Sequence, residues 1–242
     1  MIPLRRLLRE AARCVLAGPS VGSMGRRLAF APLRLWLTNP RRALLFVAVR
    51  PYTMLPYPRL AKLAELAEEC EKDGIAGAFV ECGSYRGGSA AVIISAAVHR
   101  RVHIFDSFQG CPEPSEFDVS FSGRKGQPGE ACANRTHLQR ILVRLGLSAD
   151  VHAGWFSETV GKVAKRIGPI ALLHIDCDWH TSVKTCFLHL WDSVSPGGFI
   201  IVDDFFYWQG ANKAVVEFYR EKAIPLCVVR TDASGGWIRK AR

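Results

Sequence analysis

The sequence predicts a doubly wound α/β fold, in which a mostly parallel, seven-stranded sheet ends in an antiparallel C-terminal hairpin and follows a helical N-terminal arm. Five short apolar segments alternate with segments of helical period between residues 59 and 222, which is the pattern of repeated βα units. Two further strand-like segments at the end of the chain flank a turn at 233–236. Several apolar segments end in an acidic residue, at the edge where such sheets bind ligands.

The first βα unit shows how the elements are assigned. Leu60, Leu63 and Leu66 follow a 3.6-residue period, so residues 59–72 are expected to form a helix. Residues 77–81 read as a strand, and a helix is expected at 90–98 after a glycine-rich turn. The other strands are expected at 102–106, 150–155, 170–176 and 199–203, the helices at 136–145, 157–167, 182–194 and 212–222, and the hairpin strands at 226–230 and 237–240. Pro-Gly-Gly at 196–198 is expected to turn into the fifth strand, and residues 111–134 to form a long loop.

Charge divides the chain into a basic arm at 1–50 and a domain at 51–242. The arm holds ten arginines and one acid, Glu10, whereas the domain holds 22 basic and 21 acidic residues. The domain is therefore electrically ordinary, and we expect no nucleic-acid partner. Apolar residues recur at helical spacing between 2 and 15, and further apolar stretches follow at 26–37 and 41–49.

Two interpretations of the arm remain open from its sequence. It packs on the domain or on a partner subunit with its arginines in water, or it adsorbs to an anionic membrane surface. Basic, acid-poor arms also resemble organelle transit peptides. Eight scattered cysteines without a CxxC pair indicate a reduced, intracellular protein. No uncharged apolar run reaches the roughly 18 residues that span a bilayer, so we expect a cytoplasmic protein, peripheral at the inner membrane face under the second interpretation.

The turn after the first strand predicts a nucleoside ligand. Gly83, Gly87 and Gly88 let the backbone approach a ligand closely, and the helix that follows points its amide groups toward it. The spacing G-x-x-x-G-G departs from the dinucleotide fingerprint, and no Gly-Lys-Ser/Thr sequence follows, which excludes a P-loop. Asp106 ends the second strand, where a carboxylate can accept hydrogen bonds from ribose hydroxyls.

Acidic residues at the ends of two later strands predict a metal site. Asp176 and Asp178 end the fourth strand, and Asp203 and Asp204 end the fifth. Like charges this close are unfavourable unless a proton or a cation lies between them, and oxygen ligands favour Mg²⁺, Mn²⁺ or Ca²⁺. His180 follows the fourth strand and is a candidate base for a substrate hydroxyl.

Several segments together resemble the macrocin O-methyltransferase family, which methylates sugar hydroxyls in antibiotic biosynthesis. The segments are Tyr52-Thr-Met54 with Arg59-Leu60, residues 79–89, Asp106-Ser-Phe-Gln-Gly110, Gly154-Trp-Phe156 with Glu158-Thr159, Leu173-His-Ile-Asp-Cys-Asp178 and residues 195–204. They occur in the family's order. Where the family usually has Asp-Gly-Asp-Leu-Tyr, this chain has Asp176-Cys-Asp-Trp-His180, so the resemblance leaves the acceptor open.

The resemblance implies a class I, Rossmann-like methyltransferase that uses S-adenosylmethionine (SAM) with Mg²⁺ or Mn²⁺. Around SAM it places Glu81, Gly83, Ser84, Tyr85, Gly88 and Ser89 at the methionine part, Asp106 at the ribose, Ser107 and Phe108 on the adenosine side, and Trp155 and Phe156 at the adenine. It assigns the metal to Asp176, Asp203 and Asp204, with Asp176 as a second candidate for the catalytic base beside His180.

We therefore expect an O-methyltransferase that acts on a hydroxyl of a sugar, a glycosylated small molecule or a glycan. The metal would bind the acceptor oxygen and lower its pKa, and the loop at 111–134 would close as a lid. A homo-oligomer is expected. The alternatives are a nucleotide-cofactor oxidoreductase, which the glycine spacing disfavours, and a non-catalytic adaptor of the same fold at a membrane surface.

Overall fold

The structure is a computed structural model that describes residues 2–16 and 31–241. The first part of the apolar stretch expected at 26–37 lies outside the described residues. None of the described helices is both long and apolar enough to cross a membrane.

A seven-stranded sheet forms the centre of the domain, in the order β3-β2-β1-β4-β5-β7-β6. The five parallel strands are β1 (Ala78–Cys82), β2 (Val102–Asp106), β3 (Asp150–Ala153), β4 (Ile170–Ile175) and β5 (Val194–Val202). The hairpin strands β6 (Val229–Arg230) and β7 (Gly236–Arg239) follow, and β7 pairs antiparallel with β5. The prediction of a mostly parallel, seven-stranded sheet with an antiparallel C-terminal hairpin is confirmed.

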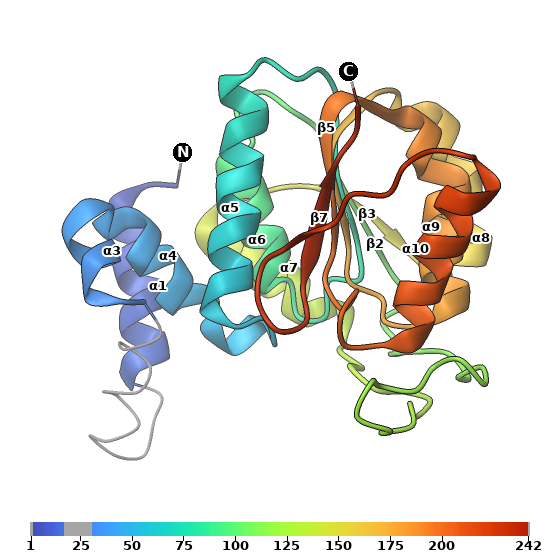
Figure 1. Cartoon of the computed structure of the whole chain (residues 1–242). Coiled ribbons are helices and arrows are strands. Elements are labelled where there is room, and N and C mark those ends of the chain that lie inside the picture. Colours follow the sequence, from blue (N-terminus) through green and yellow to red (C-terminus); the bar gives the residue numbers. More distant parts are fainter. Residues whose placement is uncertain (1, 17–30, 242) are drawn as a thin grey trace.

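Helices cover both faces of this sheet (Figure 1). On one face lie α5 (Tyr57–Lys72), α6 (Gly88–Ala96) and α7 (Arg135–Leu145), and on the other lie α8 (Phe156–Ile167), α9 (His180–Leu190) and α10 (Gln209–Glu221). The central strands are buried on both faces and therefore read as continuous apolar runs rather than as alternating patterns.

The chain enters β5 differently from the sequence prediction. Residues 196–198 were expected to form a turn before the strand, and the strand was expected only from 199. In the structure β5 already begins at Val194, and its register with β4 shifts between Ile170 and Leu172. Gly197 takes a φ of +79°, so the glycines kink a continuous strand where a turn was expected. The helix expected at 182–194 is also shorter at its end. Because β5 begins at Val194, α9 ends at Leu190, and a short 3₁₀ helix, η2 (Trp191–Ser193), leads into the strand.

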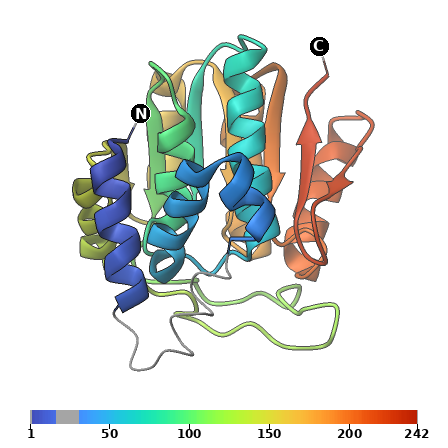
Figure 2. The same cartoon turned by 90° about the vertical axis from the view of Figure 1, so that its left-hand side faces the viewer.

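The arm adds a further layer outside α5 and α6 (Figure 2). It contains α1 (Leu4–Leu16), α3 (Leu33–Thr38) and α4 (Pro40–Val49), and η1 (Arg50–Tyr52) joins it to α5. One side of α1 is buried at Leu7 and Ala11, in the same apolar cluster as α4 and α7. Glu10 of α1 lies 3.5 Å from Arg144 of α7. This side of the arm therefore packs on the domain, while the boundary at residue 50 stays a prediction.

The strand order reverses between β1 and β4, because β2 and β3 lie on one side of β1 while β4 and β5 lie on the other. Helices that leave such a pair of strands diverge to opposite faces and open a crevice beyond the carboxyl ends of the strands. The glycine turn and the acidic strand ends both lie at this crevice.

Candidate active site

A cavity of about 370 Å³ opens at the switch point of the sheet. Residues that follow β1, β2, β4 and β5 line it, together with the start of α8 and the loop after β2. Six of the residues expected around SAM line this cavity: Gly83, Tyr85, Asp106, Ser107, Trp155 and Phe156. Arg59 and the four aspartates at 176, 178, 203 and 204 line it as well.

Gly83 makes the close approach that the sequence predicts, although its nearest neighbour is protein backbone. Its φ is +90°, and a Cβ at this position would lie 1.8 Å from the carbonyl oxygen of Asp176. The amide of Gly83 donates to Phe105 O, and that of Asp176 donates to Cys82 O. The turn after β1 is thus packed directly against the end of β4, where only glycine fits.

Asp106 holds the glycine turn in place. Its Oδ2 accepts hydrogen bonds from the amides of Ser84 (2.7 Å) and Tyr85 (3.0 Å) and from the Ser84 hydroxyl (3.0 Å). Its Oδ1 accepts one from the amide of Phe108 (2.7 Å). A carboxylate has about four acceptor positions, so Oδ1 retains capacity for a hydroxyl group in the cavity.

Five other residues expected at the cofactor do not line the cavity: Glu81, Ser84, Gly88, Ser89 and Phe108. Glu81 is fully buried, and its Oε1 lies 3.0 Å from His174 Nδ1 on β4. Its Oε2 has no hydrogen-bond partner among the described residues. Ser84 and Ser89 are buried in the turn and in the first turn of α6. These side chains support the cavity from behind.

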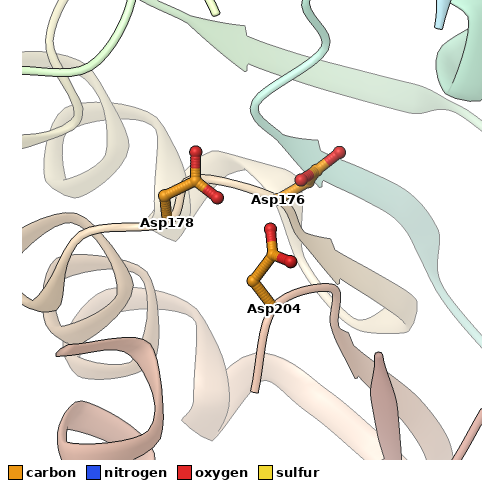
Figure 3. A group of neighbouring side chains, drawn as sticks. All are labelled: Asp176, Asp178 and Asp204. Carbon is orange, nitrogen blue, oxygen red and sulfur yellow. The ribbon is translucent and has the colours of Figure 1, made fainter. Parts of the chain in front are cut away.

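Three carboxylates that line the cavity gather together (Figure 3). Asp176 and Asp178 follow β4 and Asp204 follows β5, and one oxygen of each lies within 4.8 Å of the others. Burial raises the pKa of Asp176 and of Asp178, and the neighbouring carboxylates raise both further. Asp178 takes a φ of +56°, which is unfavourable for a residue with a side chain and is common at functional sites.

Asp203, which the resemblance assigns to the metal, has a different partner. It is 2% exposed and forms an ion pair with Arg59 of α5. Arg59 also lies 3.1 Å from Asp232 in the hairpin turn and 3.5 Å from Asp204. Burial and Asp204 raise the pKa of Asp203 to about 7, although Arg59 opposes this shift. The carboxylates that gather are therefore those of Asp176, Asp178 and Asp204.

His180 is the first residue of α9 and does not line the cavity. Its Nε2 lies 3.1 Å from Glu217 of α10, and its ring stacks obliquely on Phe117. Asp176, in contrast, lines the cavity beside Gly83. Of the two residues expected as the base, only Asp176 faces the space where a substrate could bind.

The loop at 111–134 is anchored on the α9 and α10 side of the cavity. Phe121 donates to Tyr207 O and Gln209 donates to Val119 O through their amides, and Trp179 Nε1 donates to Pro112 O. Asp118, 1% exposed, accepts hydrogen bonds from the amide and hydroxyl of Ser115 and from the amide of His180 (2.6–2.7 Å). Cys111 and Pro112 of this loop line the cavity. In this structure the loop forms one wall of the cavity, and its movement as a lid stays a prediction.

Sequence reasoning gave no role to Arg59, which it named only within a segment of the family resemblance, and it did not name Asp118. Arg59 lies in the first turn of α5, where a cation is a common surface residue, and its carboxylate partners are more than 140 positions away. Asp118 lies in a loop rich in polar residues, so nothing local separates it from solvated neighbours. The Ser115-x-x-Asp118 spacing of its local hydrogen bonds is the one usable sequence signal.

The comparisons with known proteins agree with this geometry. A family model described as Macrocin-O-methyltransferase (TylF) matches residues 46–240. Mycinamicin III 3''-O-methyltransferase of Micromonospora griseorubida is 31% identical over 204 residues, which cover 78% of this chain and 79% of the relative. Demethyldecarbamoylnovobiocin O-methyltransferase of Streptomyces niveus is 27% identical over 208 residues, 79% of this chain and 76% of the relative.

Solved structures show the same arrangement of strands and helices. The O-methyltransferase NovP is 25% identical and covers 79% of this chain and 83% of its own, with a TM-score of 0.71. An O-methyltransferase from Bacillus cereus in complex with SAH covers 98% of this chain and 90% of its own, with a TM-score of 0.53; at 15% identity it supports the fold alone.

Proposed function

The chain belongs to the macrocin O-methyltransferase family of SAM-dependent enzymes, and from this we propose that it transfers a methyl group to a hydroxyl of a sugar or a glycosylated small molecule. One observation supports this most directly: the glycine turn after β1 and the gathered carboxylates line the same cavity, and Gly83 packs against the backbone of Asp176. A methyl donor and an acceptor hydroxyl can therefore meet there in line.

The cavity residues fit SAM. Asp106 Oδ1 has acceptor capacity for the ribose hydroxyls, and Trp155 and Phe156 offer aromatic faces to the adenine. The backbone at Gly83 and Tyr85 borders the space left for the methionine part. The buried Glu81 and its partner His174 lie behind this turn, so their effect on SAM is through the turn's position.

The carboxylates fit a divalent cation such as Mg²⁺ or Mn²⁺, and we propose Asp176, Asp178 and Asp204 as its ligands. Three oxygens within 4.8 Å of one another are a donor set that these hard cations prefer. Burial and the neighbouring carboxylates raise the pKa of Asp176 and of Asp178, which fits two acids that lie together without a cation beside them. When bound, the cation would supply Lewis-acid activation of the acceptor hydroxyl.

The protein's own side chains hold the site in place and accept the proton from the acceptor hydroxyl. Asp176 is the candidate that accepts the proton from the acceptor hydroxyl, because its side chain lines the cavity beside Gly83. Arg59 holds Asp203 and Asp232 and so fixes the end of β5 that carries Asp204. The loop residues Cys111 and Pro112 close one side against water.

This proposal expects a cytoplasmic enzyme that works as a homo-oligomer on a small-molecule or glycan acceptor, with no nucleic acid. To test it, the protein would be titrated calorimetrically with SAM and, separately, with NAD. Transfer of the labelled methyl group from SAM would then be followed on a panel of glycosides and their aglycones. Binding of SAM with transfer to glycosides but not to aglycones supports the proposal. Binding of NAD without binding of SAM would refute it.

A further inference from the structure

The apolar face of the first arm helix is wider than the part that the rest of the chain covers. Its inner part is buried against α4 and α7, as Leu7 and Ala11 show. Leu4, Leu8 and Leu16 border this buried part and are 45%, 50% and 74% exposed. Residues four apart are neighbours on a helix, so these leucines follow one row that turns gradually away from the buried side along α1. A helix that only packs on a domain needs an apolar face no wider than its contact, so the exposed row requires its own explanation.

A row of arginines runs beside the row of leucines. Arg5, Arg9 and Arg13 are also four residues apart, and all three are exposed. The neighbouring helix α3 repeats the combination on a smaller scale, because Leu33 and Leu37 are 73% and 77% exposed. Figure 2 shows the arm helices as the outermost layer on their side of the molecule. We call the exposed leucines and arginines of α1 and α3 the outer arm surface: Leu4, Arg5, Leu8, Arg9, Arg13, Leu16, Leu33, Arg34 and Leu37.

The arm directs its negative charge inward. Glu10 is the one acidic residue of positions 1–50 and is only 4% exposed. Its carboxylate lies 2.6 Å from Arg13 and 3.5 Å from Arg144 of α7. Glu10 thus pairs with Arg13 at the edge of the outer arm surface, and because the arm holds no other acid, Arg5, Arg9 and Arg34 add positive charge beside the exposed leucines.

We propose that the outer arm surface docks on an anionic phospholipid bilayer. Leucines in a row can enter the boundary between headgroups and acyl chains, and arginines beside them bind lipid phosphates through two parallel hydrogen bonds. Each arginine near an anionic leaflet adds to the electrostatic attraction. The one acid of the arm, Glu10, is buried, so no exposed carboxylate of the arm repels the lipid phosphates. The helix lies along the membrane surface, and its inner side keeps it attached to the domain.

A second copy of this chain fits the same surface less well. In a two-fold symmetric dimer the same patch meets itself, so two surfaces that both carry Arg5, Arg9 and Arg34 would be brought together. The leucines would then be buried at the cost of like-charge repulsion. The charge of the surface thus favours lipid phosphates over self-association.

Sedimentation of the full-length protein with lipid vesicles tests the proposal without any methyl transfer, so its outcome is independent of the proposed function. We expect binding to vesicles of phosphatidylcholine mixed with phosphatidylglycerol, and little binding to phosphatidylcholine alone or in high salt. The double variant Leu4→Ser/Leu8→Ser should lose at least about tenfold in affinity, and Arg5→Gln/Arg9→Gln a comparable amount. Leu188→Ser is the matched control, since Leu188 is 54% exposed on α9 across the sheet.

Circular dichroism and thermal unfolding would establish that each variant is folded before binding is compared. The proposal is overturned if the wild-type protein does not bind anionic vesicles, or if Leu188→Ser weakens binding as much as the arm variants do. It is also overturned if analytical ultracentrifugation shows a dimer that becomes monomeric in Leu4→Ser/Leu8→Ser, because the surface would then be an interface between copies.

Discussion

The backbone of Asp176 occupies the space that a side chain on Gly83 would need. A Cβ on Gly83 would lie 1.8 Å from the Asp176 carbonyl oxygen, and the φ of Gly83 is +90°. The two residues follow neighbouring strands, β1 and β4, on either side of the switch point. The proposed cofactor turn and the proposed metal ligands are therefore parts of one packed unit.

Replacement of Gly83 by alanine should abolish SAM binding and lower the stability of the fold. The positive φ alone costs on the order of 1–2 kcal/mol for a residue with a side chain, and the overlap must in addition displace the end of β4. Thermal unfolding and SAM calorimetry would measure the two effects. Gly74→Ala is the control, because Gly74 has a φ of +63° and no atom within 4 Å of its Cβ position. It should lose stability but bind SAM normally. Wild-type SAM affinity in Gly83→Ala would contradict this prediction.

Asparagine at position 178 should weaken Mn²⁺ binding much more than asparagine at position 203. Asp178 contributes an oxygen to the gathered set, whereas Asp203 is engaged by Arg59. Asparagine keeps the shape of aspartate and tolerates the positive φ of residue 178, so the change removes mainly charge. We expect a loss of about tenfold or more for Asp178→Asn and less than about threefold for Asp203→Asn, by Mn²⁺ electron paramagnetic resonance titration. The reverse order would favour the ligand set drawn from the family resemblance.

Without a divalent cation, the contribution of Asp203 to stability should fall as the pH rises from about 4 to about 7. Burial and Asp204 raise the pKa of Asp203 from 3.8 to about 7, so the folded protein holds a proton that the unfolded chain has released. An acid with a raised pKa contributes stability at low pH and loses that contribution as the pH passes from its unfolded to its folded value. Asp176 and Asp178 act in the same direction.

Thermal unfolding in EDTA and in Mg²⁺, at a series of pH values, would measure this effect. Since a cation must displace protons from the carboxylates, the stabilisation by Mg²⁺ should grow from pH 5 to pH 8. In EDTA, the pH dependence of Asp203→Asn should be flatter than that of the wild type. A stabilisation by Mg²⁺ that does not change with pH would argue against a carboxylate site.

The sheet could be predicted because its signals are local. The alternation of segments, the glycine turn and the acids at strand ends all lie in short stretches, and parallel strands bring their carboxyl ends to one edge. Asp106 and Gly83 were therefore placed near each other without coordinates. The kink at Gly197 was not predicted, because a Pro-Gly-Gly sequence fits a turn as well as a bulge and only pairing with β4 decides between them.

Which aspartates gather could not be predicted from the sequence. The answer depends on Arg59, which lies 144 positions before its partner Asp203 in the chain. Asp203 and Asp204 are adjacent in the sequence, but Asp203 is the one that Arg59 of α5 engages closely, whereas Asp204 lies 3.5 Å from Arg59 and gathers with Asp176 and Asp178. Likewise, the partner of Glu81 is His174 on another strand. Such pairings follow from tertiary packing, and the sequence holds no spacing that encodes them.

Removal of the Asp118 carboxylate should release the loop at 111–134. Asp118→Ala leaves three hydrogen-bond donors, two on Ser115 and one on His180, without their acceptor, at an expected cost of about 3 kcal/mol. Faster limited proteolysis within the loop and a lower melting temperature would show the release. Asp192→Ala is the control for a largely exposed carboxylate, and it should change neither measurement appreciably. A loop as resistant as in the wild type would mean that the backbone pairing with residues 207–209 suffices to hold it.

The catalytic base can be identified by comparing His180 with Asp176. Asp176 faces the cavity, so Asp176→Asn should lower the rate of methyl transfer by about 100-fold or more, the usual contribution of a general base. His180 is turned toward Glu217 of α10, and glutamine can keep a hydrogen bond to that carboxylate, so His180→Gln should retain the rate within a small factor. Single-turnover kinetics at saturating SAM would separate this chemical step from binding.

Because Asp176 is also a proposed ligand, Mn²⁺ titration of Asp176→Asn must accompany the kinetics. A variant that still binds the ion but transfers slowly has lost the base, and one that no longer binds it has lost the site. If His180→Gln is the slower of the two, α9 must move to bring the imidazole into the cavity, and the geometry described for residue 180 would not be that of the working enzyme.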